Sequence, residues 1–258
     1  MSRGTALITG ASSGIGAAFA RLFAAEGFDL VLTARREQKL QALADDIPTA
    51  TKILVLPGDL STSAGITAFC DSVSSQSLEI DVLVNNAGMM VEEEFPNLTP
   101  EQIERTITLN ITALTLLIHQ FLPAMKARKS GRILNVASVA AFHPVPGMDI
   151  YAATKAYVLS FSEALAENLR DTGISVTALC PGLTDTDMVD TSVAGAMPTF
   201  MVSQPEEVAR SGFNALMKRE VICIPGKANR LALAWAQHQP RWLVRGLGGL
   251  ANKLTRQG

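Results

Sequence analysis

The chain has 258 residues, of which 48% are hydrophobic and 18% are charged, and its formal net charge is −2. Domains average about 100–200 residues, but α/β folds often reach about 250 as one unit, so we expect a single globular domain. A net charge this close to zero argues against a nucleic acid or a strongly acidic partner, and we expect neither.

The first residues, MSRGTALITG, lack a charged segment followed by an apolar run, and no uninterrupted apolar run reaches the roughly 18 residues of a membrane span. Cys70, Cys180 and Cys223 are odd in number, and each lies in an apolar run. Such cysteines are typical of buried thiols in a reducing compartment rather than of disulfides or a metal site. We therefore expect a cytoplasmic protein that is neither secreted nor membrane-spanning.

Short apolar runs alternate with segments of helical period along the chain. The runs predict strands at residues 5–10, 28–34, 52–58, 80–88, 132–138, 174–182 and 221–226. Because they are apolar on both faces and a helix fits between successive strands, they predict an α/β fold: a doubly wound parallel sheet of about seven strands with helices on both faces. Pro123 should kink the helix predicted over 111–128 or mark its last turn. Residues 1–258 then form one domain with a helical tail over about 227–258.

A glycine-rich turn, TGASSGIG, follows the first predicted strand at residues 9–16. Gly10 can adopt a backbone conformation closed to larger residues, and Gly14 lets main-chain N–H groups approach a pyrophosphate at the helix N-terminus. Gly16 allows the helix to pack closely on the sheet. Any tight strand-to-helix turn could use these glycines, but their place after the first strand and before a helix favours a dinucleotide site.

The GxxxGxG spacing of this turn resembles the short-chain dehydrogenase/reductase family more than the GxGxxG fingerprint of other dinucleotide-binding proteins. Further motifs follow in the order of that family over residues 4–190. They are Asp59–Leu60 after the third strand, NNAG (85–88) after the fourth, Asn110, Ser138 after the fifth, YAATK (151–155), and PGLTDT (181–186) after the sixth. The resemblance implies a Rossmann-like fold, oxidoreductase activity on a CH–OH or C=O group, and a homodimer or homotetramer.

The resemblance assigns cofactor contacts at the carboxyl ends of the predicted strands, where ligands bind in open α/β sheets. Asp59 would hydrogen-bond the adenine amino group, the backbone of Asn86–Gly88 would line the adenine ribose, and Thr186 with the 182–184 backbone would hold the carboxamide. The full expected cofactor set is Gly10, Ser12, Ser13, Gly14, Ile15, Gly16, Arg35, Arg36, Asp59, Leu60, Asn86, Ala87, Gly88, Tyr151, Lys155, Pro181, Gly182, Thr184 and Thr186.

The end of the second predicted strand favours NADP over NAD. The strand ends at Thr33–Ala34, without the carboxylate that would hold a ribose 2′-hydroxyl, and Arg35 and Arg36 follow at once. A carboxylate would repel a 2′-phosphate, whereas a guanidinium can bind it with two hydrogen bonds. Two arginines at the start of a helix can also be a solvated face, but the missing acid makes NADP the expected cofactor. Many NADP-dependent members carry a basic residue where this chain has Ser13. In this chain only Arg35 and Arg36 therefore indicate a pocket for the 2′-phosphate.

Tyr151 and Lys155 lie four residues apart in an alanine-rich helical segment, so both side chains project from one helix face. Such a pair alone is more often a core tyrosine beside a lysine with a buried stem. Ser138 at a strand end and Asn110 upstream complete the family's Asn–Ser–Tyr–Lys set. The resemblance makes Tyr151 the acid and base, with a lysine ammonium and an oxidised nicotinamide nearby favouring its phenolate.

The other members of the set have supporting roles by the same resemblance. Lys155 would hydrogen-bond the nicotinamide ribose, Ser138 would donate a hydrogen bond to the substrate oxygen, and Asn110 would orient Lys155, through water. No metal is expected. His119, His143 and His238 are scattered and form no ligand cluster, so each is expected on the surface or in the core.

The side chains expected around Tyr151 are apolar, and residues 133–154 and 181–209 contain no arginine or lysine that could clamp a carboxylate. Core packing would account for several of them. Apolar residues in loops at the carboxyl edge nevertheless favour a pocket and lid for ketone, aldehyde, steroid-like or fatty 3-oxoacyl substrates. The expected lining is Met89, Met90, Val139, Phe142, Val145, Pro146, Met148, Met197, Phe200 and Met201.

These features predict hydride transfer between NADP(H) and the carbonyl or alcohol carbon of an apolar small molecule. A 3-oxoacyl thioester reductase is the alternative among enzymes. A protein that senses NADP without catalysis is the alternative of another class, but such a protein has no need of Ser138, Tyr151 and Lys155 together.

The chain is asymmetric in charge. From Val221 onward it has six basic and no acidic residues, so this segment carries +6 and the remainder −8. Over residues 241–258 the leucines fall on one face of a predicted helix and the arginines on the other, which suits either packing on protein or docking on a membrane surface. Gly246, Gly248 and Gly249 weaken a helix that must form on lipid, so packing on protein is favoured.

Overall fold

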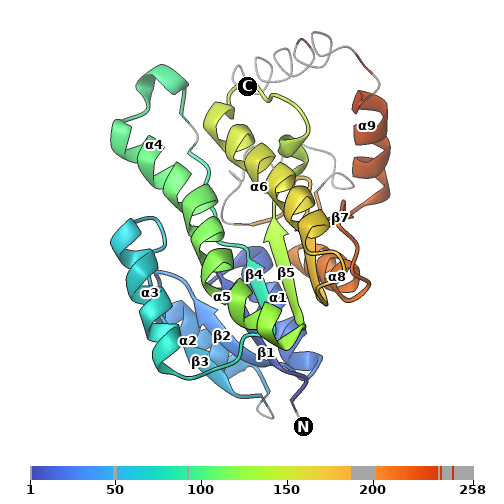
Figure 1. Cartoon of the computed structure of the whole chain (residues 1–258). Helices are drawn as coiled ribbons and strands as arrows, with labels where there is room; N and C mark the ends of the chain where they lie inside the picture. The colour runs from blue at the N-terminus through green and yellow to red at the C-terminus, as the bar shows by residue number, and fades with distance from the viewer. Residues whose placement is uncertain are drawn as a thin grey trace.

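The computed structural model describes residues 2–48, 51–91, 93–186, 202–237, 239 and 246. Within these residues seven strands, all parallel to their neighbours, form one sheet in the order β3-β2-β1-β4-β5-β6-β7 (Figure 1). The strands are β1 (Thr5–Thr9), β2 (Asp29–Thr33), β3 (Ile53–Val55), β4 (Val82–Asn85), β5 (Gly131–Val136), β6 (Ile174–Leu179) and β7 (Ile222–Cys223). The predicted doubly wound parallel sheet, Rossmann-like and with seven strands, is confirmed.

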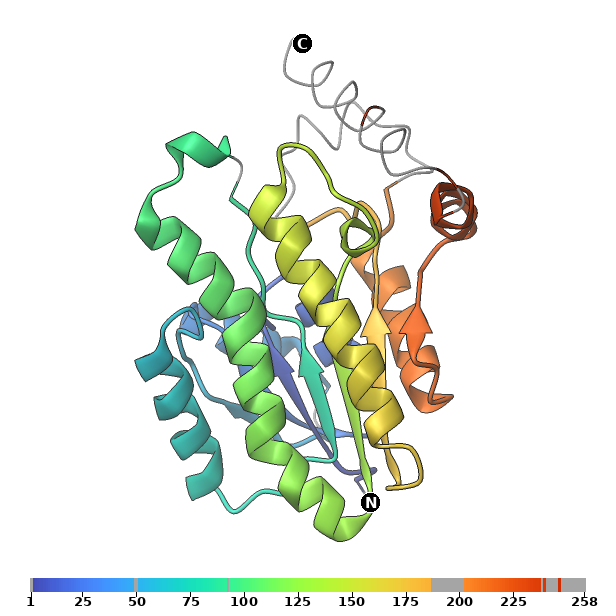
Figure 2. The same ribbon diagram turned by 45° about the horizontal axis from the view of Figure 1, so that its top comes forward.

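Helices cover both faces of the sheet because each strand sends alternate side chains to opposite sides. On β1, Ala6 and Ile8 belong to one buried cluster and Leu7 to the other. The first cluster lies under α1 (Gly14–Ala25), α2 (Glu37–Asp46) and α8 (Pro205–Met217). The second lies under α3 (Ser63–Ser75), α5 (Leu114–Arg128) and α6 (Asp149–Asn168), the three helices in front of the sheet in Figures 1 and 2.

A long helical segment begins earlier than the predicted 111–128. It consists of α4 (Pro100–Ile107), the π-helical turn η2 (Thr108–Ala113) and α5, and it continues through Pro123 to Arg128. By length and composition this segment is the one helix among the described residues that could span a membrane. It packs on the sheet through Leu114, Leu117 and Ile118, as the core helix of a globular protein does.

The order of the strands places the ligand site. β1 pairs with β2 on one side and with β4 on the other, so the chain changes direction in the sheet between β1 and β4. Loops from these neighbouring strands diverge at the carboxyl edge and leave a crevice there, which is where ligands of open α/β sheets bind. The short helix η3 (Val139–Ala141) follows β5 at this edge, and α9 (Lys227–Gln237) follows β7.

The three cysteines are free thiols. Cys180 is buried as expected, whereas Cys70 and Cys223 are half-buried, which corrects the expectation of three buried thiols. Burial raises the pKa of Cys180 to about 12 and that of Cys223 to about 11, so both remain protonated at neutral pH and are poor nucleophiles.

Candidate active site

A cavity of about 850 Å³ opens at the carboxyl edge of the sheet, large enough for a dinucleotide and a small second molecule. It brings together Ser138, Tyr151 and Lys155 of the predicted catalytic set. Apart from Gly16, every predicted cofactor residue also lines it: Gly10, Ser12, Ser13, Gly14, Ile15, Arg35, Arg36, Asp59, Leu60, Asn86, Ala87, Gly88, Tyr151, Lys155, Pro181, Gly182, Thr184 and Thr186.

The glycine turn keeps open the space that a diphosphate needs. Gly10 and Gly14 have φ angles of +67° and +53°, a region that favours glycine. A Cβ on Gly14 would lie 2.9 Å from the Thr186 side chain, and a Cβ on Gly16 would collide with the carbonyl oxygen of Gly10. Gly16 therefore serves the close packing of α1, while the free N-terminus of α1 at the cavity fits an anionic group.

Thr9 and Asn86 fasten the glycine turn to the end of β4. The Thr9 hydroxyl accepts hydrogen bonds from the backbone N–H groups of Asn86 and Ala87, at 3.0 and 2.9 Å. In return the Asn86 side-chain amide donates to the carbonyl oxygens of Thr9 and Gly10, at 2.9 and 3.2 Å. The side chain of Asn86 thus holds the turn, and its backbone lines the cavity.

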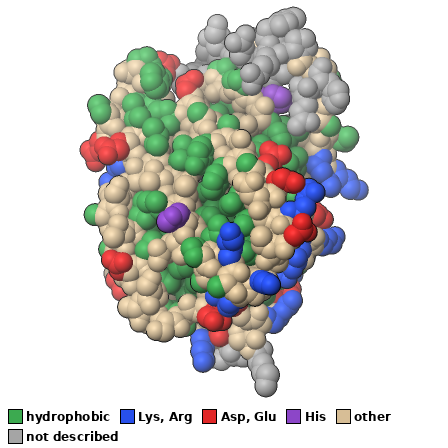
Figure 3. All heavy atoms as spheres, in the orientation of Figure 1, with side chains coloured by type: hydrophobic (Ala, Val, Ile, Leu, Met, Phe, Trp, Pro, Cys, Tyr) green, Lys and Arg blue, Asp and Glu red, His purple; other side chains and the backbone are tan. Residues whose placement is uncertain are grey.

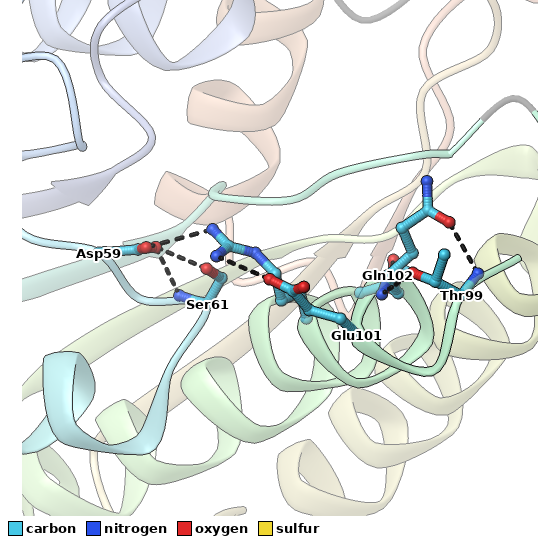
Figure 4. Close-up of polar contacts among 7 residues, drawn as sticks. Asp59, Ser61, Thr99, Glu101 and Gln102 are labelled. Carbon is cyan, nitrogen blue, oxygen red and sulfur yellow. Dashed lines mark hydrogen bonds and ion pairs between the residues drawn. The ribbon is translucent and has the colours of Figure 1, made fainter.

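Asp59 follows β3 and accepts hydrogen bonds from Ser61 in the same loop and from Arg105 of α4. Ser61 donates its backbone N–H and its hydroxyl to Oδ1 at 3.0 and 2.6 Å, and Arg105 of α4 donates to Oδ2 at 3.2 Å (Figure 4). Burial raises the pKa of Asp59, but the bonds from Ser61 and the charges of Arg105 and Arg35 outweigh it, so the pKa lies below its ordinary value. The carboxylate is therefore fixed and ionised at the cavity wall.

The exposed Arg36 side chain contacts the glycine turn. Its Nη2 donates to the hydroxyls of Ser12 and Ser13, at 3.2 and 3.0 Å. Ala34 and Arg35 line the cavity beside it. The Arg36 guanidinium and these two hydroxyls form a donor set suited to a phosphate, and β2 ends at Thr33, followed by Ala34, rather than at a carboxylate that would repel it.

Lys155 is 5% exposed, and its Nζ donates to the carbonyl oxygen of Val136 at 2.8 Å. Burial lowers its pKa from 10.5 to about 8, so the ammonium form still prevails at neutral pH. A Cβ on Gly88 would lie 3.3 Å from Lys155 Nζ and 3.4 Å from Asn110 Oδ1. Lys155 and Asn110 therefore both lie next to the backbone of Gly88, which lines the cavity.

Asn110 is buried in η2 and lies behind the cavity wall. Its Oδ1 accepts the N–H of Met89, and its Nδ2 donates to the carbonyl oxygen of Met89 and to the Thr154 hydroxyl, all at 2.9 to 3.0 Å. These bonds tie η2 to the segment after β4 and to α6 next to Lys155. Asn110 thus bonds to the residue next to Lys155, and its role in orienting the lysine through water stays a prediction.

Tyr151 projects from the first turns of α6 toward Ser138, whose Oγ accepts the N–H of Ala140 at 3.1 Å. Burial raises the pKa of Tyr151, and the adjacent Ser138 hydroxyl acts in the opposite direction without overcoming it. Lys155 Nζ lies over the Tyr151 ring, 5.6 Å from its centroid, and the effect expected of this ammonium together with an oxidised nicotinamide stays a prediction. Tyr151 therefore holds its proton at neutral pH.

A buried polar chain behind the site was not anticipated from the sequence. Asn85 donates to Asn135 across β4 and β5 at 2.9 Å, and Asn135 donates to the Ser162 hydroxyl at 2.9 Å. Ser162 in turn donates to the carbonyl oxygen of Val158 at 2.6 Å. These hydrogen bonds connect the carboxyl ends of β4 and β5 to α6. An asparagine in an otherwise apolar strand was the signal that could have found it.

The substrate side of the cavity is apolar, as expected, although its composition differs from the prediction. Met90, Val139, Val145 and Met148 line it, whereas Met89, Phe142 and Pro146 do not, and Phe142 instead packs on the core. The predicted Met197, Phe200 and Met201 lie outside the described residues. The lining residues that were not predicted from the sequence include Leu109, His143, Pro144, Asn229, Leu233 and Trp235.

His143 and α9 are the main additions to the site. His143 was expected on the surface or in the core but lies at the cavity, in the loop between η3 and α6. Asn229 of α9 approaches Gly182 so closely that a Cβ there would lie 2.5 Å from its side-chain nitrogen. No group of three or more His, Cys, Asp and Glu that could hold a metal ion occurs in the part of the chain that the structure describes.

Comparisons with known proteins identify the family and agree with the fold. Residues 4–196 match the protein family described as short chain dehydrogenase. The chain is 32% identical to the ketoacyl reductase HetN of a Nostoc species over 92% of this chain and 85% of that protein. It is 38% identical to the structure of a short-chain dehydrogenase from Sphingobium yanoikuyae in complex with NADPH, with a TM-score of 0.82 and 91% and 93% of the two chains covered. A bulky-bulky ketone specific alcohol dehydrogenase from Comamonas testosteroni is 32% identical, with a TM-score of 0.79 and 92% and 93% covered.

Proposed function

Because the chain belongs to the short-chain dehydrogenase family, we propose that it transfers a hydride between NADP(H) and the carbonyl or alcohol carbon of an apolar small molecule. Membership makes it a nicotinamide-dependent oxidoreductase that acts on CH–OH or C=O groups. The observation that carries the proposal is one cavity with the glycine turn and Arg36 on one wall and Ser138, Tyr151 and Lys155 on the other.

The residues of the first wall suit the cofactor. The N-terminus of α1 would hold the diphosphate, Arg35 and Arg36 the 2′-phosphate, and Asp59 the adenine amino group. The backbone of Asn86–Gly88 would line the adenine ribose. Thr186 and the 182–184 backbone would hold the carboxamide. The NADPH complex of the Sphingobium relative supports this choice of cofactor.

The residues of the second wall suit the chemistry. When bound, the nicotinamide supplies or accepts the hydride. Tyr151 gives its proton to the carbonyl oxygen in reduction and takes one from the hydroxyl in oxidation, and Ser138 donates a hydrogen bond to the same oxygen as charge develops on it. Lys155 holds the nicotinamide ribose and supports Tyr151, while Asn110 positions α6.

Two observations support the proposed substrate class: the apolar side of the cavity and the absence of arginine or lysine in residues 133–154. A relative described as specific for bulky ketones supports an apolar ketone or its alcohol. The similarity to the ketoacyl reductase HetN over 92% of the chain favours a 3-oxoacyl thioester as the second candidate. Turnover of a carrier-linked thioester far above that of free ketones would select the second candidate.

The test is a panel of apolar ketones, aldehydes and alcohols, together with 3-oxoacyl thioesters, followed through the absorbance of NADPH. We expect turnover with at least one apolar carbonyl compound and higher kcat/KM with NADPH than with NADH. Tight NADPH binding without turnover across the panel would favour a sensing protein. Equal or NADH-favouring kcat/KM values would refute the choice of cofactor.

A further inference from the structure

The outer face of α9 carries two large apolar side chains that contact little protein. Leu231 is 72% exposed, the highest value among the large hydrophobic side chains that the structure describes, and Trp235 is 53% exposed. The two residues lie four positions apart and therefore share one helix face. Leu233 between them is 8% exposed and faces the protein. An open apolar face of this kind is typical of a surface that binds something else.

The same helix forms part of the rim of the active-site cavity. Asn229, Leu233 and Trp235 line the cavity, so Trp235 belongs both to its mouth and to the outer face. Met148, at the start of α6, also lines the cavity and is 36% exposed. The start of α6 and α9 lie at the same end of the molecule in Figures 1 and 2. Whatever covers α9 therefore also lies at the substrate entrance.

Charge narrows the choice of what covers α9. Lys227 and Arg230 on this helix are exposed, and the chain from Val221 onward has six basic and no acidic residues, against a charge of −8 on the remainder. A tryptophan and a leucine flanked by basic side chains match the interface of an anionic bilayer, where headgroups offer negative charge and the boundary below them accepts apolar rings. A second copy of the chain would repel this basic segment with its own +6 segment, and it could attract the segment only through the −8 remainder.

We propose that α9 docks on anionic phospholipid membranes, with Leu231 and Trp235 in the headgroup region and the mouth of the cavity facing the lipid. An apolar substrate dissolved in the bilayer then reaches the cavity without crossing water. The sequence had favoured packing of residues 241–258 on protein, and those residues lie outside the described structure apart from Gly246. The proposal goes beyond the hydride transfer reaction, and its test uses no turnover, so the two can fail separately.

The first test is flotation of the full-length protein with vesicles. We expect binding to vesicles of equal parts phosphatidylserine and phosphatidylcholine, little binding to phosphatidylcholine alone, and release as salt rises from about 0.01 to 0.1 M, which shortens the Debye length from about 30 to about 10 Å. Leu231→Glu should lower the bound fraction at least fivefold. Leu78→Glu, the same change at a 41% exposed leucine after α3, should leave it unchanged. No binding by the wild type, or equal loss in both variants, would overturn the proposal.

The second test uses the fluorescence of Trp235, which becomes the sole tryptophan in Trp242→Phe because the chain has only two. Anionic vesicles should shift its emission to shorter wavelength, and lipids brominated near the headgroup should quench it. A shift that grows with protein concentration without vesicles would show that a second copy covers α9 and would overturn the membrane assignment. Binding without a shift or quenching would also overturn it, because α9 would then not be the contact.

Discussion

At the scale of single residues, turnover should depend most on the hydroxyl of Tyr151. Tyr151→Phe keeps the ring but removes the transferable proton, so kcat should fall by roughly 10²- to 10⁴-fold while the Kd for NADPH stays within a few-fold. Steady-state kinetics and fluorescence titration measure the two quantities. The control is Tyr157→Phe, at the chain's other tyrosine on the same helix, whose hydroxyl pairs with Thr115 at 3.1 Å. Comparable activity of the two variants would remove Tyr151 from the chemistry.

The buried charge of Lys155 should lower the free energy of unfolding of the protein. Its folded pKa of about 8 lies below its ordinary 10.5, so the unfolded chain binds more protons between these values and this residue makes stability rise with pH there. Below pH 8 the buried ammonium lowers the free energy of unfolding by its full amount. Lys155→Met should therefore raise the free energy of unfolding at pH 7, by at most a few kcal/mol at about 1.4 kcal/mol per pKa unit. The gain over wild type should shrink toward pH 10.

Denaturant unfolding at pH 7 and pH 10 measures this difference between variant and wild type. Lys126→Met, at an exposed lysine in the last turn of α5, is the control and should show no such pH-dependent gain. A Lys155→Met protein that is less stable than wild type at pH 7 would mean that the bond to the Val136 carbonyl outweighs the burial of the charge.

Arg36 should decide much of the preference for NADP. Removing a charged hydrogen-bond partner of a phosphate costs about 1.5–3 kcal/mol, so Arg36→Ala should lower kcat/KM for NADPH roughly 10- to 100-fold and change that for NADH little. Ala34→Asp should shift the preference further toward NADH, because it adds a ribose acceptor that repels phosphate. The control is Arg21→Ala, at an exposed arginine of α1 paired with Asp46. A similar loss with both cofactors in Arg36→Ala would contradict the assignment.

At the scale of elements, α4 should influence cofactor affinity from outside the cavity. Thr99 and Gln102 form a reciprocal cap at its N-terminus, and Arg105 in its last turn holds Asp59 (Figure 4). Thr99→Ala should lower the free energy of unfolding by about 1 kcal/mol and raise the KM for NADPH a few-fold without changing kcat. Thr67→Ala is the control, since its hydroxyl bonds within α3 rather than capping it. A lower kcat with unchanged KM would separate α4 from the cofactor.

At the scale of the whole molecule, the face of α4, α5 and α6 should form an interface between copies of the chain. Ile107, Leu116 and Tyr157 are 40%, 43% and 37% exposed on these helices, and apolar side chains gather across this face in Figure 3. We expect a homo-oligomer that Leu116→Arg dissociates, because a charge cannot be buried there without a partner. Light scattering gives the mass, and Leu78→Arg is the control. A monomeric wild type would contradict this expectation.

The sequence by itself determined the sheet and the principal site residues. Apolar runs and helical periods arise from neighbouring residues, so the seven strands could be located without the fold. The motifs from TGASSGIG to PGLTDT mark the ends of strands, and parallel strands bring those ends to one edge. For that reason Ser138, Tyr151 and Lys155 could be assigned to one site although they and the glycine turn lie far apart in sequence.

The tertiary structure alone decided the partners of these residues. Arg105 reaches Asp59 across 46 positions, Asn85 reaches Asn135 across 50, and α9 returns from the end of the chain to line the cavity. Such contacts depend on how whole helices and strands pack, so the local periodicity of the sequence cannot predict them. The same holds for the pKa of Tyr151 and Lys155, because burial, which only the packed molecule creates, is the largest influence on both.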